Sequence, residues 1–167
     1  MNRFSFSLAQ SCTALACALG LPAAALATEK ATHKHYESSP EADKPGPKGE
    51  LAPRLQNLGK HLFPVTTKSK QAQLFINQGV NLAYGFNHAE AARAFKEAAR
   101  LDPSCAMAYW GQALVLGPNI NVAMTPDDEP KAYEAAQKAL SMKGKASARE
   151  RAYIEAVAKR YTGKAAD

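Results

Sequence analysis

The fold of this chain is decided by one stretch, residues 71–105, which is QAQLFINQGVNLAYGFNHAEAARAFKEAARLDPSC. Apolar residues recur over 71–84 at the spacing of a wide helical stripe. Asn87, with a glutamate three residues later, matches a helix N-cap with a capping box, so a second helix is predicted over 88–100. Pro103 ends that helix, because the residue before a proline is pushed out of the helical region. Two short helices with so little chain between them must pack antiparallel.

These residues resemble the tetratricopeptide repeat (TPR), a helix–turn–helix unit of about 34 residues. The match needs no insertion and falls on Phe75, Gly79, Leu82, Ala91, Phe95, Ala98 and Pro103. Gln78 stands where leucine is usual, and Leu82 stands where an aromatic residue is usual. Gly79 costs about 1 kcal/mol relative to alanine in mid-helix, which predicts the close approach of another helix. The resemblance implies an all-α fold of antiparallel helix–turn–helix repeats, a short TPR-like α-solenoid over 68–162.

A second, less regular repeat follows. Thirty-four residues after Phe75, Ile76, Gly79 and Leu82, the same order of two large residues, one small residue and one apolar residue recurs. The second set is Tyr109, Trp110, Ala113 and Leu116. Asp102-Pro103 is predicted to supply the N-cap and first residue of a third helix, which Gly117-Pro118 ends. A loop then leads to a fourth helix with Asp128 as its N-cap, Pro130 in its first turn, and an end near residue 142.

The first 27 residues have the features of a secretory signal peptide. They combine one positive charge, an uncharged apolar stretch and an A-x-A site, so cleavage is predicted between Ala27 and Thr28. A transmembrane anchor is the alternative, but the segment is short and interrupted by Ser, Gln and Pro. Lipidation at Cys17 is a second alternative. The mature protein is therefore expected in the periplasm or outside the cell, with no membrane span.

Cleavage would leave Cys105 as the one cysteine, so no internal disulfide is expected. Its thiol either is buried or pairs with another chain, and its position on a helix favours burial.

Residues 28–49 are rich in Pro, Gly and charge, and are predicted to be a disordered linker. His33 and His35 lie in it, but two histidines lack the remaining ligands of a metal site. Residues 50–67 are predicted to form a short helical cap segment, in which the amphipathic stretch 51–63, as a short helix or a turn, covers the edge of the first repeat. Residues 163–167 are a tail.

The segment from Ser147 to Tyr161 is predicted to be a last helix, opened by a capping box with Glu150. It is either a capping helix with a polar outer face or part of a longer array. The runs GFNHAEAARAF, LDPSCAMAYWG and LGPNINVAMTP resemble the N-terminal part of longer secreted bacterial TPR proteins, which favours the second interpretation.

The formal charge of +6 is compatible with several classes of binding partner and selects none of them. Nine basic and three acidic residues lie in 131–164. A basic face attracts acidic partners, anionic lipid or nucleic acid. Because no nucleic-acid motif is present, a solvated helix surface is the favoured interpretation.

The sequence contains no H-E-x-x-H, C-x-x-C, G-x-S-x-G or glycine-rich phosphate loop, so no catalytic residues, metal or cofactor are predicted. His88, Asn119 and Asn121 follow the first helix of their repeats, and neighbouring repeats place such loops on one edge. The three side chains are therefore weak candidates for a ligand site. The favoured alternative is that they cap helices and satisfy loop backbone.

In TPR proteins the first helix of each repeat lines a concave face that commonly binds extended peptides. The matching positions in this chain are Gln73, Ile76, Val80, Tyr84, Met107, Trp110 and Leu114. Ile76 and Val80 replace two polar positions of the usual carboxylate clamp, so an apolar or aromatic partner segment is expected. The alternative is that these side chains are core, covered by 51–63.

Two functions remain open from the sequence. The first is an exported TPR scaffold without catalytic activity that binds an unknown protein or peptide on the face of the first helices. The second is an accessory or truncated part of a larger periplasmic enzyme or carrier, including one that depends on a metal.

Overall fold

Helices make up the regular structure of residues 44–164, the part of the chain that the computed structural model describes. The elements are α1 (Lys70–Tyr84), α2 (His88–Leu101), α3 (Ala106–Leu116), α4 (Asp128–Ser141), the 3₁₀ helix η1 (Lys143–Lys145) and α5 (Ala148–Ala158). No strand occurs among these residues, which confirms the all-α prediction. The predicted signal peptide, its Ala27–Thr28 cleavage site, the His33/His35 pair and residues 165–167 lie outside the described range.

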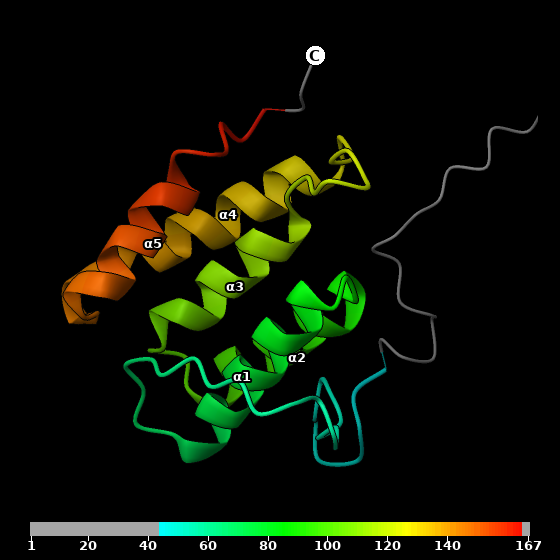
Figure 1. Ribbon diagram of the computed structural model, residues 1–167. Helices are drawn as coiled ribbons and strands as arrows, with labels where there is room; N and C mark the ends of the chain where they lie inside the picture. The colour runs from blue at the N-terminus through cyan, green and yellow to red at the C-terminus, as the bar shows by residue number, and fades with distance from the viewer. Residues whose placement is uncertain (1–43, 165–167) are drawn as a thin grey trace, which may run out of the picture. The chain divides into compact units, whose positions relative to one another are not determined.

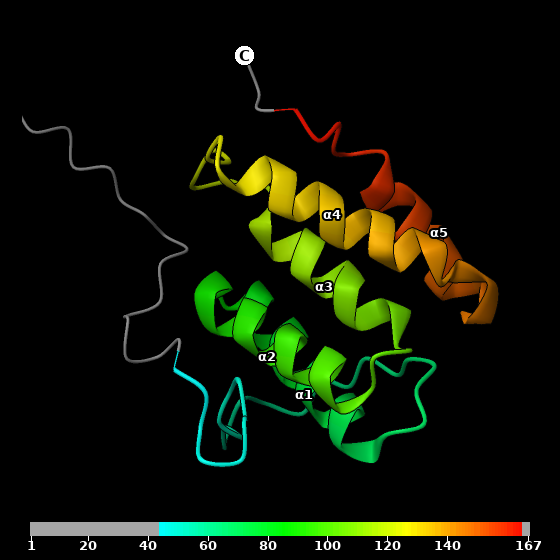
Figure 2. The ribbon, with the colours of Figure 1, turned by 180° about the vertical axis from the view of Figure 1, so that it is seen from behind.

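The helices form two antiparallel pairs followed by α5 (Figure 1). α1 packs along α2, and α3 packs along α4. α2 and α3 join the pairs, and α5 lies against α3 and α4. Figure 2 shows α2, α3 and α4 side by side on the back of the molecule.

Helix starts follow the capping residues of the sequence. Ser69 Oγ accepts a bond from Ala72 N at 3.1 Å, and Asn87 Oδ1 accepts one from Glu90 N at 3.4 Å. Ser147 and Glu150 form both bonds of the predicted capping box at the start of α5. These local bonds satisfy amide groups that have no partner inside a helix.

The third helix begins later than predicted. Asp102 and Pro103 do not open it; α3 starts at Ala106, with Cys105 at the N-cap position. Asp102 instead bonds the turn between the helices, because its Oδ1 accepts from Ser104 N at 3.0 Å and from Ser104 Oγ at 2.6 Å. Its other carboxylate oxygen, Oδ2, accepts from Thr67 Oγ1 and Lys68 N, which precede α1.

The fourth helix differs from its prediction by one residue. Asp128, the predicted N-cap, is already helical, and Asp127 is the N-cap. Thr125 Oγ1 donates to Asp128 Oδ2 at 2.6 Å, and Pro130 lies in the first turn as expected.

The prediction of a helix over 51–63 is wrong, because this stretch contains no regular structure. Asn57 and Gly59 have φ angles of 62° and 92°, in the left-handed region that interrupts a helix. Within the predicted linker, residues 44–49 form a turn in which Gly49 N donates to Gly46 O at 2.9 Å. The stretch that follows lies over α1, as the amphipathic pattern suggested, but as extended chain (Figure 1).

The Phe95 ring of α2 is fully buried between two glycines of neighbouring helices. A Cβ atom on Gly79 of α1 would lie 2.7 Å from this ring, and one on Gly111 of α3 would lie 2.3 Å from it. The close helix approach predicted at Gly79 is therefore confirmed. A second glycine, Gly111, lets α3 approach the same ring.

Replacing Gly111 with alanine is expected to destabilise the protein by about 1–3 kcal/mol, because overpacking at the Phe95 ring outweighs the better helix propensity of alanine. Gly79→Ala should act in the same direction. Gly144 is the matched control, since a Cβ there would meet nothing within 4 Å. Urea unfolding followed by circular dichroism measures the effect; equal midpoints for Gly111→Ala and Gly144→Ala would contradict this packing.

Candidate functional site

An extended segment, residues 51–68, crosses α1 and then turns back to its start (Figure 1). We refer to it as the strap. Its main-chain groups bond to side chains of the helices. Gln78 makes two such contacts: Oε1 accepts from Leu55 N at 3.0 Å, and Nε2 donates to Pro53 O at 2.9 Å. Its Oε1 also accepts from the side chain of Arg54, from Nη1 at 3.1 Å.

Further along α1, two more amide side chains hold the second half of the strap. Asn77 Oδ1 accepts from Phe63 N at 2.9 Å. Gln73 Nε2 donates to Phe63 O at 2.9 Å, while Gln73 Oε1 accepts from Val65 N at 2.9 Å. Because these bonds go to main-chain groups, the polar face of α1 is suited to hold extended polypeptide.

Three buried carboxylates anchor the strap from other helices. Glu97 of α2 accepts from Leu51 N at 2.9 Å. Asp102 accepts from Thr67 Oγ1 at 2.5 Å and from Lys68 N at 3.1 Å. Glu150 of α5 accepts from Thr66 Oγ1 at 2.6 Å and from Thr66 N at 2.5 Å.

These bonds stabilise the charged form of each carboxyl. Burial favours the neutral form of Asp102, but bonds from the hydroxyls of Ser104 and Thr67 and from two backbone amides outweigh it and lower its pKa to about 2. The pKa values of Glu97 and Glu150 are lowered as well: burial opposes ionisation, and bonds from Arg100 and Leu51 to Glu97, and from Thr66 and Ser147 to Glu150, outweigh it.

An aromatic cluster joins the strap to α3 and α5. Phe63 stacks on Trp110 with ring centroids 5.6 Å apart and planes 9° from parallel. Tyr153 of α5 meets both rings edge-on, at 5.6 Å from Trp110 and 5.9 Å from Phe63. The guanidinium carbon of Arg149 lies 5.2 Å from the centroid of the Phe63 ring.

The predicted partner-binding residues occupy very different environments. Ile76, Val80, Met107 and Trp110 were expected on an open face, but the structure places all four in the core. Gln73 and Leu114 are half-buried, and Tyr84 is 81% exposed. The strap accounts for part of this burial because its Phe63 covers Trp110. The alternative that these side chains are core is therefore confirmed for the four residues, and its covering by 51–63 is seen at Trp110.

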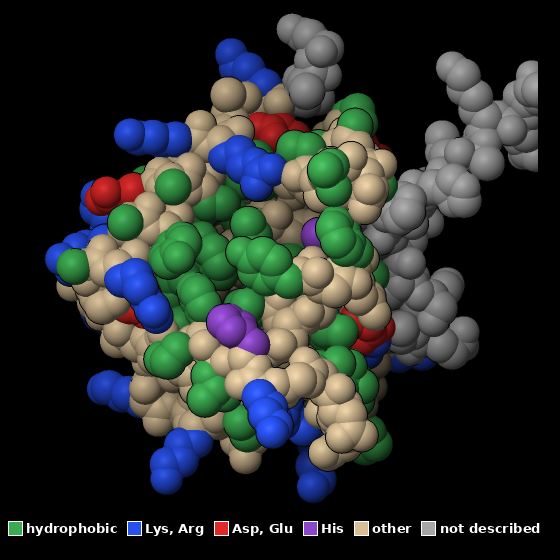
Figure 3. Space-filling view, viewed as in Figure 1, with side chains coloured by type: hydrophobic (Ala, Val, Ile, Leu, Met, Phe, Trp, Pro, Cys, Tyr) green, Lys and Arg blue, Asp and Glu red, His purple; other side chains and the backbone are tan. Residues whose placement is uncertain are grey.

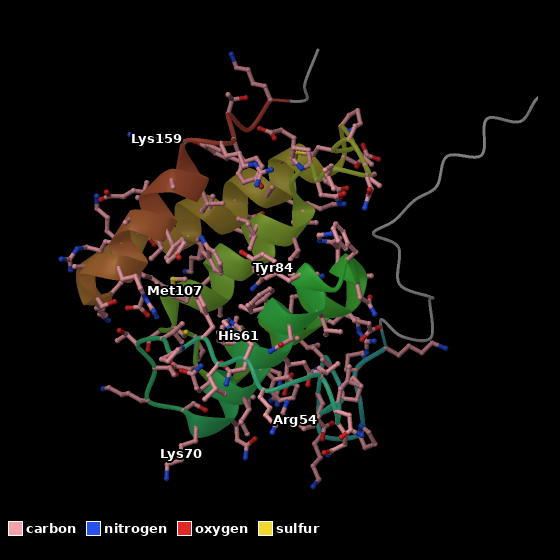
Figure 4. The ribbon with its side chains drawn as sticks, viewed as in Figure 1. Arg54, His61, Lys70, Tyr84, Met107 and Lys159 are labelled. Atoms are coloured by element: carbon pink, nitrogen blue, oxygen red, sulfur yellow. The ribbon has the colours of Figure 1, made fainter. Side chains whose placement is uncertain are left out.

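What remains open on this side is an apolar patch bordered by cations. Hydrophobic side chains gather in the middle of the face, with lysines and arginines around them (Figure 3). Tyr84 lies in the middle of the same face (Figure 4). Leu114 of α3 is half-buried, and Tyr153 of α5 is 43% exposed. We give the name aromatic face to Tyr84 and Leu114 together with the cluster of Phe63, Tyr153 and the buried Trp110.

The structure brings together His88, the first residue of α2, and Asn119 of the loop between α3 and α4. Asn119 Nδ2 lies 3.4 Å from His88 Nε2, and Asn119 Oδ1 accepts from Asn121 N at 2.8 Å and from Val122 N at 3.1 Å. Asn119 therefore satisfies loop backbone, as the favoured alternative has it. Residues 44–164 contain no group of three or more His, Cys, Asp or Glu side chains placed to hold a metal ion.

The Cys105 thiol is fully buried, as the sequence favoured. Burial raises its pKa to about 11. Because the thiolate is the reactive form, this cysteine is suited to packing and not to nucleophilic chemistry.

A separate hollow lies between α2, α3 and α4, on the side of the molecule shown in Figure 2. Its volume is about 860 Å³, and Tyr109 and Gln112 of α3 contribute to its lining. Two of its cations form ion pairs: Arg93 with Glu90 at 2.8 Å and Lys131 with Asp128 at 3.3 Å. This hollow shares no residue with the aromatic face.

Sequence reasoning missed Phe63 and Tyr153 as members of the face and Arg149 as its cationic neighbour. A helical pattern could have found the two α5 residues, because Arg149 and Tyr153 are four residues apart and share one side of the helix. Phe63 carries no such signal, since the strap has no periodic structure.

Comparison with models of known protein families, with curated proteins and with solved structures found no match. Within residues 44–164, no helix has the length and apolar character needed to cross a membrane. The functional argument therefore depends on the chemistry of the face itself.

The buried carboxylates predict a loss of stability in acid. In the unfolded chain an aspartate binds a proton near pH 4, about two pH units above the value for folded Asp102. The folded chain thus binds fewer protons in this range, and the contribution of Asp102 to stability, complete above about pH 5, is lost as the pH falls through about 2. Glu97 and Glu150 act in the same direction.

Urea unfolding midpoints at pH 7 and pH 3 measure this dependence. The drop between the two pH values should be smaller in Asp102→Asn than in the unchanged protein. Glu134→Gln, at an exposed site on α4, should keep the full drop. An Asp102→Asn protein with an undiminished drop would show that this carboxylate does not carry the effect.

Proposed function

We propose that this protein is an exported helical scaffold of the TPR type that binds an extended, apolar or aromatic segment of a partner protein on the aromatic face. In this proposal α1–α2 and α3–α4 are two repeats, and α5 begins a third hairpin or caps the array. The protein itself performs no catalysis, and its partner supplies the activity.

The observation that carries this proposal is the strap. Side chains of α1 hold its main chain by amide bonds, and Trp110 and Tyr153 surround its Phe63 ring. The chemistry of this side thus suits extended polypeptide with an aromatic residue. A partner segment would lie beside the strap, on the surface that Tyr84, Leu114 and Tyr153 leave accessible.

Aromatic residues at such a surface supply most of the binding energy of an interface. Tyr84 is the one large side chain of the patch that is almost fully exposed, and it projects from the last turn of α1. Exposed apolar surface of this kind marks a site of interaction.

A peptide library displayed on phage tests the proposal. Selected peptides should share an apolar or aromatic centre and should change the fluorescence of Trp110, the one tryptophan of the chain. Tyr84→Ala should weaken their binding by about tenfold or more, the effect expected of a hot-spot residue. Ile120→Ala is the control, because Ile120 is 90% exposed but belongs to the α3–α4 loop. Equal binding by the two variants would refute the location of the site.

Export is the second part of the proposal and depends on residues 1–27. A bacterial host that expresses the full chain should release a protein whose N-terminal residue is Thr28, as N-terminal sequencing can measure. Ala27→Arg should block cleavage, because the site requires a small residue, whereas Thr28→Ser should leave it intact. Recovery of an uncleaved chain from the cytoplasm in all three cases would exclude a signal peptide.

A further inference from the structure

Two arginines lie near the two ends of α5: Arg149 is in its first turn, and Arg160 lies two residues past its last residue, Ala158. Because Lys159 N and Arg160 N still donate to Glu155 O and Val157 O, a tightened last turn continues to Arg160, and the eleven-residue separation keeps the two positions on about the same side of the axis. Tyr153 and Ala156 lie between them on this side. All four residues are exposed, so the stripe is open to solvent.

The two arginines contact different parts of the molecule. Arg149 lies over Phe63 and donates to Pro64 O. Arg160 donates from Nη2 to Pro118 O at 2.7 Å, just beyond the end of α3. Tyr153, between them in sequence, contacts Trp110. The stripe therefore has a ring of the aromatic cluster in its middle and a cation near each end.

Neither guanidinium is neutralised within residues 44–164. Both arginines bond to carbonyl oxygens, and neither forms an ion pair there. The acidic residues of α5 are engaged elsewhere: Glu150 holds the strap, and Glu155 pairs with Lys143 at 2.8 Å. Each guanidinium has five N–H donors, so its bond to one carbonyl leaves donors for a carboxylate.

We propose that the partner segment carries an acidic residue on each side of its apolar centre, and that Arg149 and Arg160 bind these two carboxylates. This inference rests on the proposed function and specifies its ligand. From Arg149 to Arg160 the chain rises about 17 Å, along α5 to Ala158 and then through a tighter last turn, and extended chain rises about 3.3 Å per residue. The two acidic residues are thus about five positions apart, with apolar or aromatic residues between them.

A surface with two cations and an apolar centre between them favours an acidic protein segment over other anions. The centre of the stripe offers Tyr153 and its aromatic neighbours, which a side chain can cover but a phosphate group cannot. Exposed ion pairs are weak and sensitive to salt, so the arginines contribute specificity more than affinity.

Two synthetic peptides test the inference with the purified protein. One has the sequence Glu-Ala-Leu-Phe-Ala-Glu with blocked ends, and the other has glutamine in place of both glutamates. At low salt the acidic peptide should bind about fivefold or more tightly than the neutral one, as isothermal titration can measure. Arg149→Gln and Arg160→Gln should each reduce this preference by about two- to fivefold, and 0.5 M salt should largely remove it.

Lys159→Gln is the matched control, because it removes the same charge from a position off the stripe and should keep the preference. Equal binding of the two peptides would overturn the acidic flanks while the proposed function stands. If neither peptide nor any library peptide binds, the proposed function fails as well. Arginine-dependent binding to vesicles that contain phosphatidylserine, without binding of either peptide, would assign the stripe to lipid and overturn the inference.

Discussion

The rest of the structure depends on one contact, the Phe95 ring between Gly79 and Gly111. This ring fills the space that two side chains would otherwise occupy, so α1 and α3 both approach α2 closely. Their approach places the two helices beside each other, with their outer sides on one face of the molecule. The strap and the aromatic face are built on that pair, since Asn77 and Gln73 come from α1 and Trp110 comes from α3.

The strap explains why α1 departs from the pattern of the family that it resembles. Gln78 occupies a position where leucine is usual, and it is buried because its amide holds both sides of the Pro53–Leu55 backbone. A buried amide is stable only when its polar atoms are bonded. Helix α1 is thus suited to hold an additional layer of chain, which the residues before it provide.

The same layer limits the surface that a partner can use. Phe63 covers Trp110, so the accessible part of the face moves toward Tyr84 and along α5. On that side, the buried Glu150 in the first turn of α5 binds Thr66 of the strap, while Arg149 and, just past the end of the helix, Arg160 remain exposed. A partner would therefore meet aromatic rings at the centre and cations at the ends.

The sequence by itself determined the five helices, the caps of α2 and α5, the close approach at Gly79 and the burial of Cys105, because these features arise from periodicity and from bonds between near neighbours in the chain. Tertiary structure alone decided the path of the strap, the late start of α3 and the burial of Ile76, Val80, Met107 and Trp110. Each of these depends on partners distant in sequence, such as Glu150 with Thr66 or Asp102 with Thr67, which compete successfully with local capping and helix formation. A local sequence pattern cannot predict which of these bonds form, because that depends on which groups the packed helices bring together.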